Sequence, residues 1–238
     1  MGRNNYFQFK QFTVIQEKSA MKVGTDGVLL GAWANVSNAK EILDVGTGTG
    51  VIALMMAQRS NAKITAIEIE KNSFKEASFN FQNSPWSNRF ISINDSFQNY
   101  SSNSTEKYDL IISNPPFFEN VSKALNQNRS NARHNDLLPF QDLIQGSFKL
   151  LNDTGRLAIV IPTEQSERII FLAETIKLYI ERLTKVKPKP GKPSHRHLIE
   201  FSMKKLNPLI DELTIEKETH HNFTMEYKNL TKDFYLAF

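Results

Sequence analysis

The stretch EILDVGTGTG, residues 41–50, decides the fold of this chain. Its first half is a largely apolar run typical of a buried strand, and three glycines at alternate positions follow at once. The apolar segment 51–57 then predicts a helix, so the order is strand, glycine turn, helix. The spacing G-x-G-x-G departs from the dinucleotide pattern G-x-G-x-x-G, and no Lys-Ser/Thr pair completes a P-loop. The turn therefore favours a nucleoside-type ligand without a pyrophosphate.

An acidic side chain ends the next predicted strand. Residues 63–67 form that strand, and Glu68 follows 18 residues after Gly50. A carboxylate about 20 residues past a glycine turn is where a ribose diol binds in such a sheet, and a chance surface acid is the alternative. The short strand 89–94 likewise leads into Asp95. Asp95 either accepts a hydrogen bond from an adenine amino group or serves as a turn or helix-cap residue.

A motif rich in acceptors follows the apolar strand 108–112. It is SNPPF, residues 113–117. Two prolines end the strand, and the stiff turn presents carbonyl acceptors with few donors. Asn114 adds a side-chain carbonyl and Phe117 a flat ring. These parts can accept from an exocyclic amino group and stack on the ring that carries it, whereas a plain strand terminator is the alternative.

The rest of the chain alternates between strands and helices. This alternation predicts a mostly parallel sheet with helices on both faces. The expected helices are 72–82, 139–151 and 164–177, and the expected strands are 155–162, an antiparallel pair at 180–186 and 196–202, and one near 213–215. In the lead-in, Thr25 or Asp26 is expected to cap a helix; alternatively, residues 22–26 close over a ligand. The polar segment 120–136 predicts a mobile loop.

Composition limits the class of protein. The chain has 238 residues, a net charge of +4 and no cysteine, which excludes disulfides and thiolate metal sites. No apolar run approaches the roughly 20 residues of a membrane span, and no apolar leader begins the chain, so we expect a cytoplasmic protein. Five cations without an acid among them lie in residues 185–196. This basic segment suggests phosphate contacts, with a solvated loop as the alternative.

The glycine turn, Glu68, Asp95 and SNPPF all fall at the carboxyl ends of successive predicted strands, so they predict one crevice. The set formed by DVGTGTG (44–50), these two acids and NPPF (114–117) resembles the class I S-adenosylmethionine-dependent methyltransferases that methylate amino groups.

Two further segments narrow the resemblance. The lead-in KVGTDGVLLGAW (22–33) and the pair Arg133-His134 are similar to the bacterial tRNA1(Val) adenine-N6 methyltransferase family, over about residues 6–238. This resemblance implies a Rossmann-like domain with a mostly parallel sheet of about seven strands, helices on both faces and an antiparallel C-terminal strand pair. We expect one methyltransferase domain over 1–238, made of a lead-in (1–38), a catalytic core (39–206) and a C-terminal extension (207–238).

The resemblance also implies the roles of individual residues. The cofactor S-adenosylmethionine would be bound by Lys22, Gly24, Thr25, Asp44, Gly46, Thr47, Gly48, Gly50, Glu68 and Asp95. The catalytic residues would be Asn114, Pro115 and Phe117. Substrate contacts would come from Pro116, Phe118, Arg133, His134, Lys185, Lys187, Lys189, Lys192 and Arg196. The implied partner is tRNA, with no membrane and no metal, and the chain would be a monomer or homodimer.

Three other functions fit part of the pattern. An N5-glutamine protein methyltransferase acts on an amide that offers the same two N–H donors. Other adenine-N6 methyltransferases of rRNA or DNA share the NPPF motif. A catalytically silent nucleic-acid-binding module would keep the fold without the reaction, although the intact motifs favour an enzyme.

Overall fold

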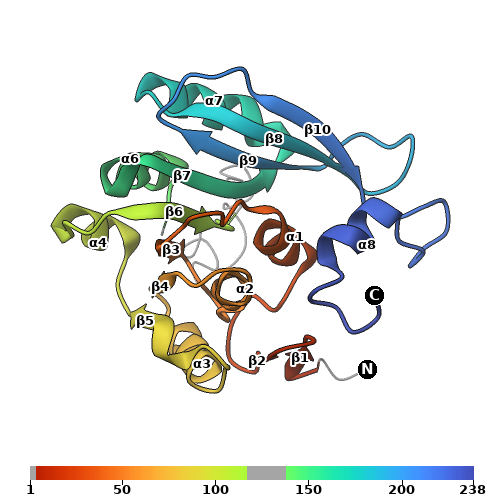
Figure 1. Cartoon of the computed structure of the whole chain (residues 1–238), viewed down its shortest axis with the longest axis horizontal. Helices are drawn as coiled ribbons and strands as arrows, with labels where there is room; N and C mark the ends of the chain where they lie inside the picture. Colours follow the sequence, from red (N-terminus) through yellow and green to blue (C-terminus); the bar gives the residue numbers. More distant parts are fainter. Residues whose placement is uncertain (1–3, 117–137) are drawn as a thin grey trace, which may run out of the picture.

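An eight-stranded sheet forms the centre of the computed structural model, which describes residues 4–116 and 138–238 (Figure 1). The strand order is β10-β8-β9-β7-β6-β3-β4-β5. Strand β9 is antiparallel to both of its neighbours, and the other pairs are parallel. In chain order the strands are β3 (Glu41–Val45), β4 (Lys63–Ile67), β5 (Phe90–Ile93), β6 (Tyr108–Ser113), β7 (Leu151–Pro162), β8 (Tyr179–Lys187), β9 (Arg196–Ser202) and β10 (Leu209–Thr214).

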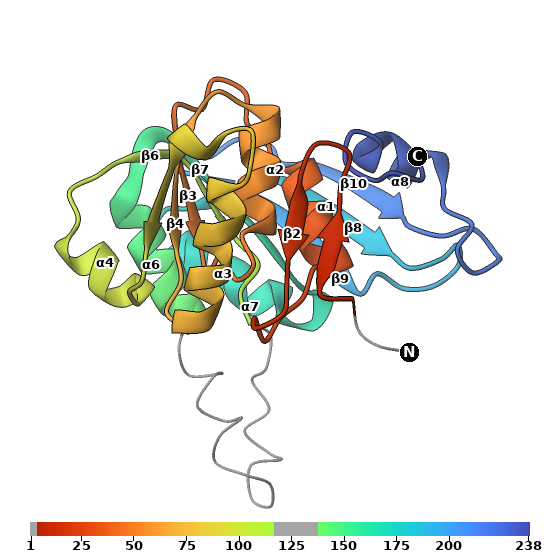
Figure 2. The same ribbon diagram turned by 90° about the horizontal axis from the view of Figure 1, so that it is seen from below.

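Helices cover both faces of this sheet (Figures 1 and 2). The helices are α1 (Thr25–Trp33), α2 (Val51–Arg59), α3 (Lys71–Gln82), α4 (Phe97–Asn103), α6 (Phe140–Leu150), α7 (Ser166–Thr175) and α8 (Met225–Thr231), with single turns η1 (Ser87–Arg89) and η2 (Thr163–Gln165). One core cluster joins α1, α2, α3 and α8 to the sheet, and a second joins α4, α6 and α7 to its other face. A small antiparallel pair, β1 (Tyr6–Gln8) and β2 (Thr13–Ile15), precedes α1.

The central strands are apolar without alternation because both of their faces are buried. Ile42 packs in the first cluster and Leu43 in the second, and Ile111 and Ile112 of β6 divide in the same way. This burial explains why the sequence of each strand is a continuous apolar run. The predicted fold class and the antiparallel pair β8–β9 are confirmed.

Three features differ from the sequence predictions. The sheet has eight strands rather than about seven, because the strand expected near 213–215 covers Leu209–Thr214 and pairs in parallel with β8 at the sheet edge, where most of its side chains are exposed. Helices α4 and α8 were not predicted, because each has only seven residues; α8 is defined by a Thr224 cap and by the packing of Tyr227. The capping prediction for α1 was wrong. Its N-cap is Gly24, without a side-chain cap bond.

The C-terminal segment is part of the main sheet. Strand β10, which lies within residues 207–238, is hydrogen-bonded to β8 of the preceding segment. The single-domain division stays a prediction. In the two described stretches, no helix has the length and apolar character needed to cross a membrane.

Candidate active site

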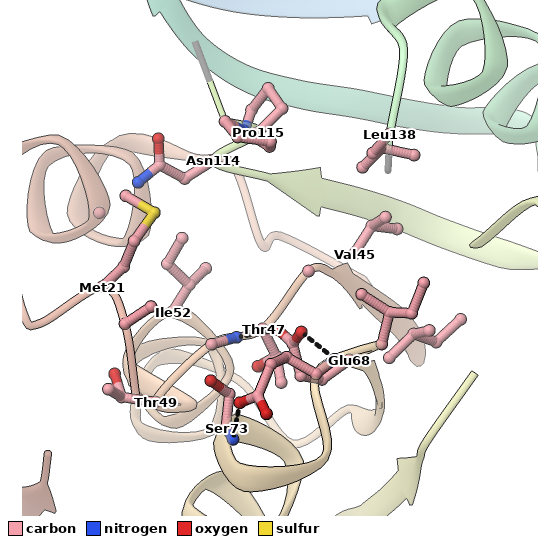
Figure 3. A pocket seen from close by; sticks show the side chains of 18 of the residues that line it. Met21, Val45, Thr47, Thr49, Ile52, Glu68, Ser73, Asn114, Pro115 and Leu138 are labelled. Atoms are coloured by element: carbon pink, nitrogen blue, oxygen red, sulfur yellow. Dashed lines mark hydrogen bonds between the residues drawn. The ribbon is translucent and has the colours of Figure 1, made fainter. Parts of the chain in front are cut away.

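A cavity of about 490 Å³ opens at the carboxyl ends of β3, β4 and β6 (Figure 3). Its size falls within the range of small-molecule sites. Asn114 and Pro115 lie at one end in Figure 3, Glu68 and Ser73 at the other, and Met21 at one side. The sequence-predicted residues that line it are Lys22, Gly24, Thr25, Gly46, Thr47, Gly48, Glu68, Asp95, Asn114, Pro115 and Pro116. Asp44 and Gly50 belong to the same turn but do not line the cavity.

The glycine turn needs its glycines for conformation. Gly46, Gly48 and Gly50 all have positive φ, at 71°, 57° and 85°. A side chain is strained in this region. At Gly50, a Cβ atom would also lie 2.5 Å from the ring of Phe81. The backbone can therefore pass close to the cavity and then enter α2 directly, because Gly50 is the N-cap of that helix.

A buried carboxyl group is hydrogen-bonded to the glycine turn and stabilises it. Asp44 is fully buried, and its Oδ2 accepts a hydrogen bond from Thr47 Oγ1 at 2.6 Å. Burial raises the pKa of Asp44 to about 7, although the Thr47 hydroxyl and the Ala53 backbone N–H oppose the shift. The charge of nearby Glu68 raises it further.

Glu68 points from the end of β4 toward the glycine turn. Its Oε2 accepts from the Gly48 backbone N–H at 2.9 Å, and its Oε1 accepts from the Glu70 backbone N–H at 2.8 Å. Burial raises the pKa of Glu68, and these two N–H groups partly counteract the shift. A carboxylate held in this way keeps lone pairs for the hydroxyls of a ribose.

Asp95 lies at the start of α4, half-buried beside the cavity. It accepts from the Ser96 backbone N–H at 2.7 Å and from Asn99 Nδ2 at 2.6 Å. It is therefore a local turn residue that also lines the cavity, and its contact with an adenine amino group stays a prediction. Glu70, which sequence reasoning missed, also lines the cavity and caps α3.

Asn114 ends β6 with an unused acceptor. Ser113 Oγ donates to the Val45 carbonyl at 2.8 Å, which ties this strand end to β3 and the glycine turn. Asn114 Oδ1 is buried and accepts no hydrogen bond within 4–116 and 138–238. A buried acceptor without a donor costs free energy, so it indicates a place prepared for a donor from a ligand.

The lead-in forms the remaining wall, and two residues that hold it were missed. Glu76 and Asn80 of α3 bind the backbone of residues 15–19, about 60 positions earlier. No local pattern could reveal these bonds, because they join distant parts of the chain.

The basic segment 185–196 is only partly available for phosphates. Arg196 donates to Asp26 at 2.9 Å, so its side chain joins β9 to the start of α1 beside the cavity. Lys187 pairs with Glu212 at 2.6 Å, and Lys189 lies 3.7 Å from Glu216. Lys185 and Lys192 form no ion pair with any described residue.

Other predicted site residues fall in the undescribed part of the chain. Phe117, Phe118, Arg133, His134 and the predicted loop 120–136 lie outside the described residues. In the described parts, Glu216, His220 and His221 form a His/Glu group whose ligand atoms lie within 4.8 Å of one another. This group is on the turn before α8 and does not line the cavity.

Two solved structures with similar folds are named as methyltransferases. A predicted O-methyltransferase from Agrobacterium tumefaciens superposes with a TM-score of 0.66 at 19% identity, covering 88% of this chain and 96% of that one. The tRNA m1G37 methyltransferase of M. jannaschii gives a TM-score of 0.61 at 15% identity, covering 87% of this chain and 57% of that one. At these identities the likeness concerns the fold alone.

Sequence relatives are much closer. The family model for the methyltransferase small domain matches residues 18–185. A protein of Trichodesmium erythraeum is 50% identical over 98% of this chain and 99% of its own length, and one of Bacteroides thetaiotaomicron is 46% identical over 98% of each. Both are named tRNA1(Val) (adenine(37)-N6)-methyltransferase. The chain therefore belongs to the tRNA1(Val) (adenine(37)-N6)-methyltransferase family.

Proposed function

We propose that this chain transfers a methyl group from S-adenosylmethionine to the exocyclic N6 of adenine 37 in tRNA1(Val). The observation that carries the proposal is the buried, unpaired Oδ1 of Asn114 at the cavity edge, in a chain whose full-length relatives bear this name. The target amine carries the two N–H donors that such an acceptor and a neighbouring peptide carbonyl require.

The cavity residues suit the cofactor. The glycine turn allows close backbone approach for the methionine part, Glu68 would hold the ribose hydroxyls, and Asp95 would meet the cofactor adenine. When bound, S-adenosylmethionine would supply a methyl group from its sulfonium, and the neutral thioether that remains is a good leaving group. The protein is then required mainly to position the acceptor nitrogen.

Asn114 and Pro115 would supply that positioning. The lone pair of an adenine amino group is conjugated into the ring, so the amine is a weak nucleophile. Two acceptors outside the ring plane, Asn114 Oδ1 and the Pro115 carbonyl, favour a pyramidal nitrogen with its lone pair directed at the methyl group. This interaction strengthens in the transition state and therefore raises the rate.

The target base must leave its stack to reach the cavity. Base-modifying enzymes extrude the nucleotide at a cost of a few kcal/mol. An anticodon loop presents bases that are already partly unstacked, which lowers this cost. Phe117, which follows the two prolines in the sequence, is our candidate for stacking on the extruded adenine.

Product analysis tests the proposal. A tRNA1(Val) transcript is incubated with the protein and methyl-labelled S-adenosylmethionine, then digested to nucleosides and analysed by mass spectrometry. The expected product is N6-methyladenosine, and a transcript with guanosine at position 37 should remain unlabelled. Label on N1 of adenine, on ribose or on protein glutamine would overturn the assignment.

A further inference from the structure

A short loop forms one side of the cavity. Residues 16–23, here called the strap, connect β2 to α1, and Ala20, Met21 and Lys22 of the strap line the cavity. Gln16 Oε1 accepts from the Val23 backbone N–H at 2.9 Å, which joins the two ends of the strap. The strap is therefore a closed loop that needs few further contacts to be fixed in place.

Glu76 of α3 supplies those contacts. Its carboxylate accepts from the backbone N–H groups of Glu17, Lys18 and Ser19, at 2.6, 2.9 and 2.9 Å. The Ser19 hydroxyl donates to the same carboxylate. Successive backbone N–H groups form a concave anion site, and here the anion is a side chain of the same protein.

The charge state of Glu76 suits this contact. Burial acts to raise the pKa of Glu76, but the Ser19 hydroxyl and the three N–H groups outweigh it and hold the pKa below its usual value. The group is therefore ionised at neutral pH, and hydrogen bonds to a charged acceptor are stronger than neutral ones.

Asn80, one turn later on α3, extends the connection to the glycine turn. Its side chain exchanges two hydrogen bonds with the Ile15 backbone, both 2.9 Å long. Its Nδ2 also donates to the Thr49 carbonyl at 2.9 Å. The N-cap of the same helix is Glu70, two residues after Glu68. Helix α3 thus links the ribose side of the cavity, the glycine turn and the strap.

We propose that Glu76 is a positioning residue for cofactor binding, because its carboxylate holds the strap where Met21 and Lys22 complete the cavity. The inference rests on the proposed function, since it takes S-adenosylmethionine as the ligand. Glu76 itself does not line the cavity and acts through the strap.

Calorimetry with S-adenosylmethionine tests the proposal. Glu76→Gln keeps the size of the side chain but presents an amide N–H₂ where the strap needs an acceptor. We expect Kd to rise about tenfold, as for losing one strong hydrogen bond. The kcat at saturating cofactor should stay within about twofold, because bound cofactor restores the strap.

Hydrogen exchange supplies a second readout. Amides 17–19 should exchange slowly in the wild type and much faster in Glu76→Gln, and added cofactor should restore part of the protection. A looser strap with unchanged Kd would overturn the proposal, because the contact would then serve folding alone.

Three variants separate positioning from general destabilisation. Lys75→Gln alters the exposed neighbour on α3 and should leave Kd unchanged. Ile169→Val, a buried position of α7 in the core cluster on the other face of the sheet, should lower stability without changing Kd. Ser19→Ala removes only the hydroxyl donor and should raise Kd about threefold, but should have no effect in the Glu76→Gln background.

The outcomes distinguish this inference from the proposed function. A wild-type protein that binds no S-adenosylmethionine would contradict the proposed function itself. Wild-type binding with unchanged Kd in Glu76→Gln would overturn only the role of Glu76. If Glu76→Gln does not fold, unchanged Kd in Ser19→Ala decides against the proposal.

Discussion

The two walls of the cavity are built in different ways. The sheet wall consists of strand ends, and its key bonds join near neighbours in the chain or in the sheet, such as Thr47 to Asp44 and Gly48 to Glu68. The strap wall is held by Glu76, 57 to 59 positions away from its partners. The first wall therefore follows from local sequence rules, whereas the second depends on the complete fold.

The largest effect should come from the acceptor end of the sheet wall. Asn114→Ala should lower kcat by about 10²–10³-fold, as for a lost transition-state hydrogen bond. Cofactor affinity, measured by calorimetry, should be nearly unchanged, because the proposed partner of Asn114 is the substrate amine rather than the cofactor. Asn114→Asp, which retains an acceptor oxygen, should keep more activity than Asn114→Ala. Equal loss in kcat and in cofactor affinity would place Asn114 in the cofactor site instead.

The next effect concerns the stability of the glycine turn. Gly50→Ala adds a Cβ atom at a φ of +85° and against the Phe81 ring, so it should cost about 2–4 kcal/mol in the free energy of unfolding. Gly191→Ala is the matched control, because its φ is +70° but no atom lies within 4 Å of the added Cβ. Urea unfolding should show a clearly smaller loss for Gly191→Ala. Equal losses would mean that Phe81 moves aside and only backbone strain matters.

Glu68 should contribute to cofactor affinity rather than to the rate of methyl transfer. Glu68→Ala should weaken S-adenosylmethionine binding by about 1–3 kcal/mol, the usual loss for hydrogen bonds to a charged group. Glu174→Ala, an exposed substitution on α7, is the control and should bind normally. Unchanged affinity in Glu68→Ala would remove this residue from the cofactor site and leave it as a support of the turn.

The difference between the two cavity walls also explains which parts of the fold and site could be predicted from the sequence. The glycine turn, Glu68 and NPPF lie at carboxyl ends of strands that read as apolar runs, so their convergence followed from the general geometry of parallel sheets. Strand β10 and helix α8 were weaker signals because neighbouring elements, rather than their own patterns, stabilise them. No pattern in the sequence indicated the hydrogen bonds between Glu76 and the strap.

The ion pairs of the basic segment also could not be predicted from the sequence. Its cations were visible in the sequence, but their partners were not. Glu212 and Glu216 belong to β10 and the turn after it, and Asp26 belongs to α1. The sequence therefore located this cluster of cations without showing which of its charges are compensated, and its contact with phosphates stays a prediction.

The buried carboxyl group of Asp44 should make the stability of the folded protein depend on pH. Its pKa is about 7 in the folded protein against an ordinary value of 3.8, so the folded state binds the proton more tightly. This contribution to stability is complete below the ordinary pKa and is lost as the pH rises toward 7. Asp44→Asn should be at least as stable as the wild type at pH 8 and lose this advantage at pH 5, by urea unfolding. Asp153→Asn, an exposed control, should track the wild type, and parallel profiles for Asp44→Asn would contradict the prediction.

The smallest effect concerns the basic segment, residues 185–196, whose Arg196 pairs with Asp26 beside the cavity. Lys185 and Lys192 lack ion-pair partners among the described residues, whereas Lys187 and Lys189 face Glu212 and Glu216. If tRNA phosphates approach here, the first two lysines should release more counterions on binding. Lys185→Gln with Lys192→Gln should then flatten the dependence of log K for tRNA on log salt by roughly one to two units.

Lys187→Gln with Lys189→Gln removes the same charge and should flatten this dependence by less than half as much, because those ammonium groups are already neutralised. Equal slopes in the two double variants would show that net charge alone matters, and a slope identical to the wild type in both would make this segment a solvated loop.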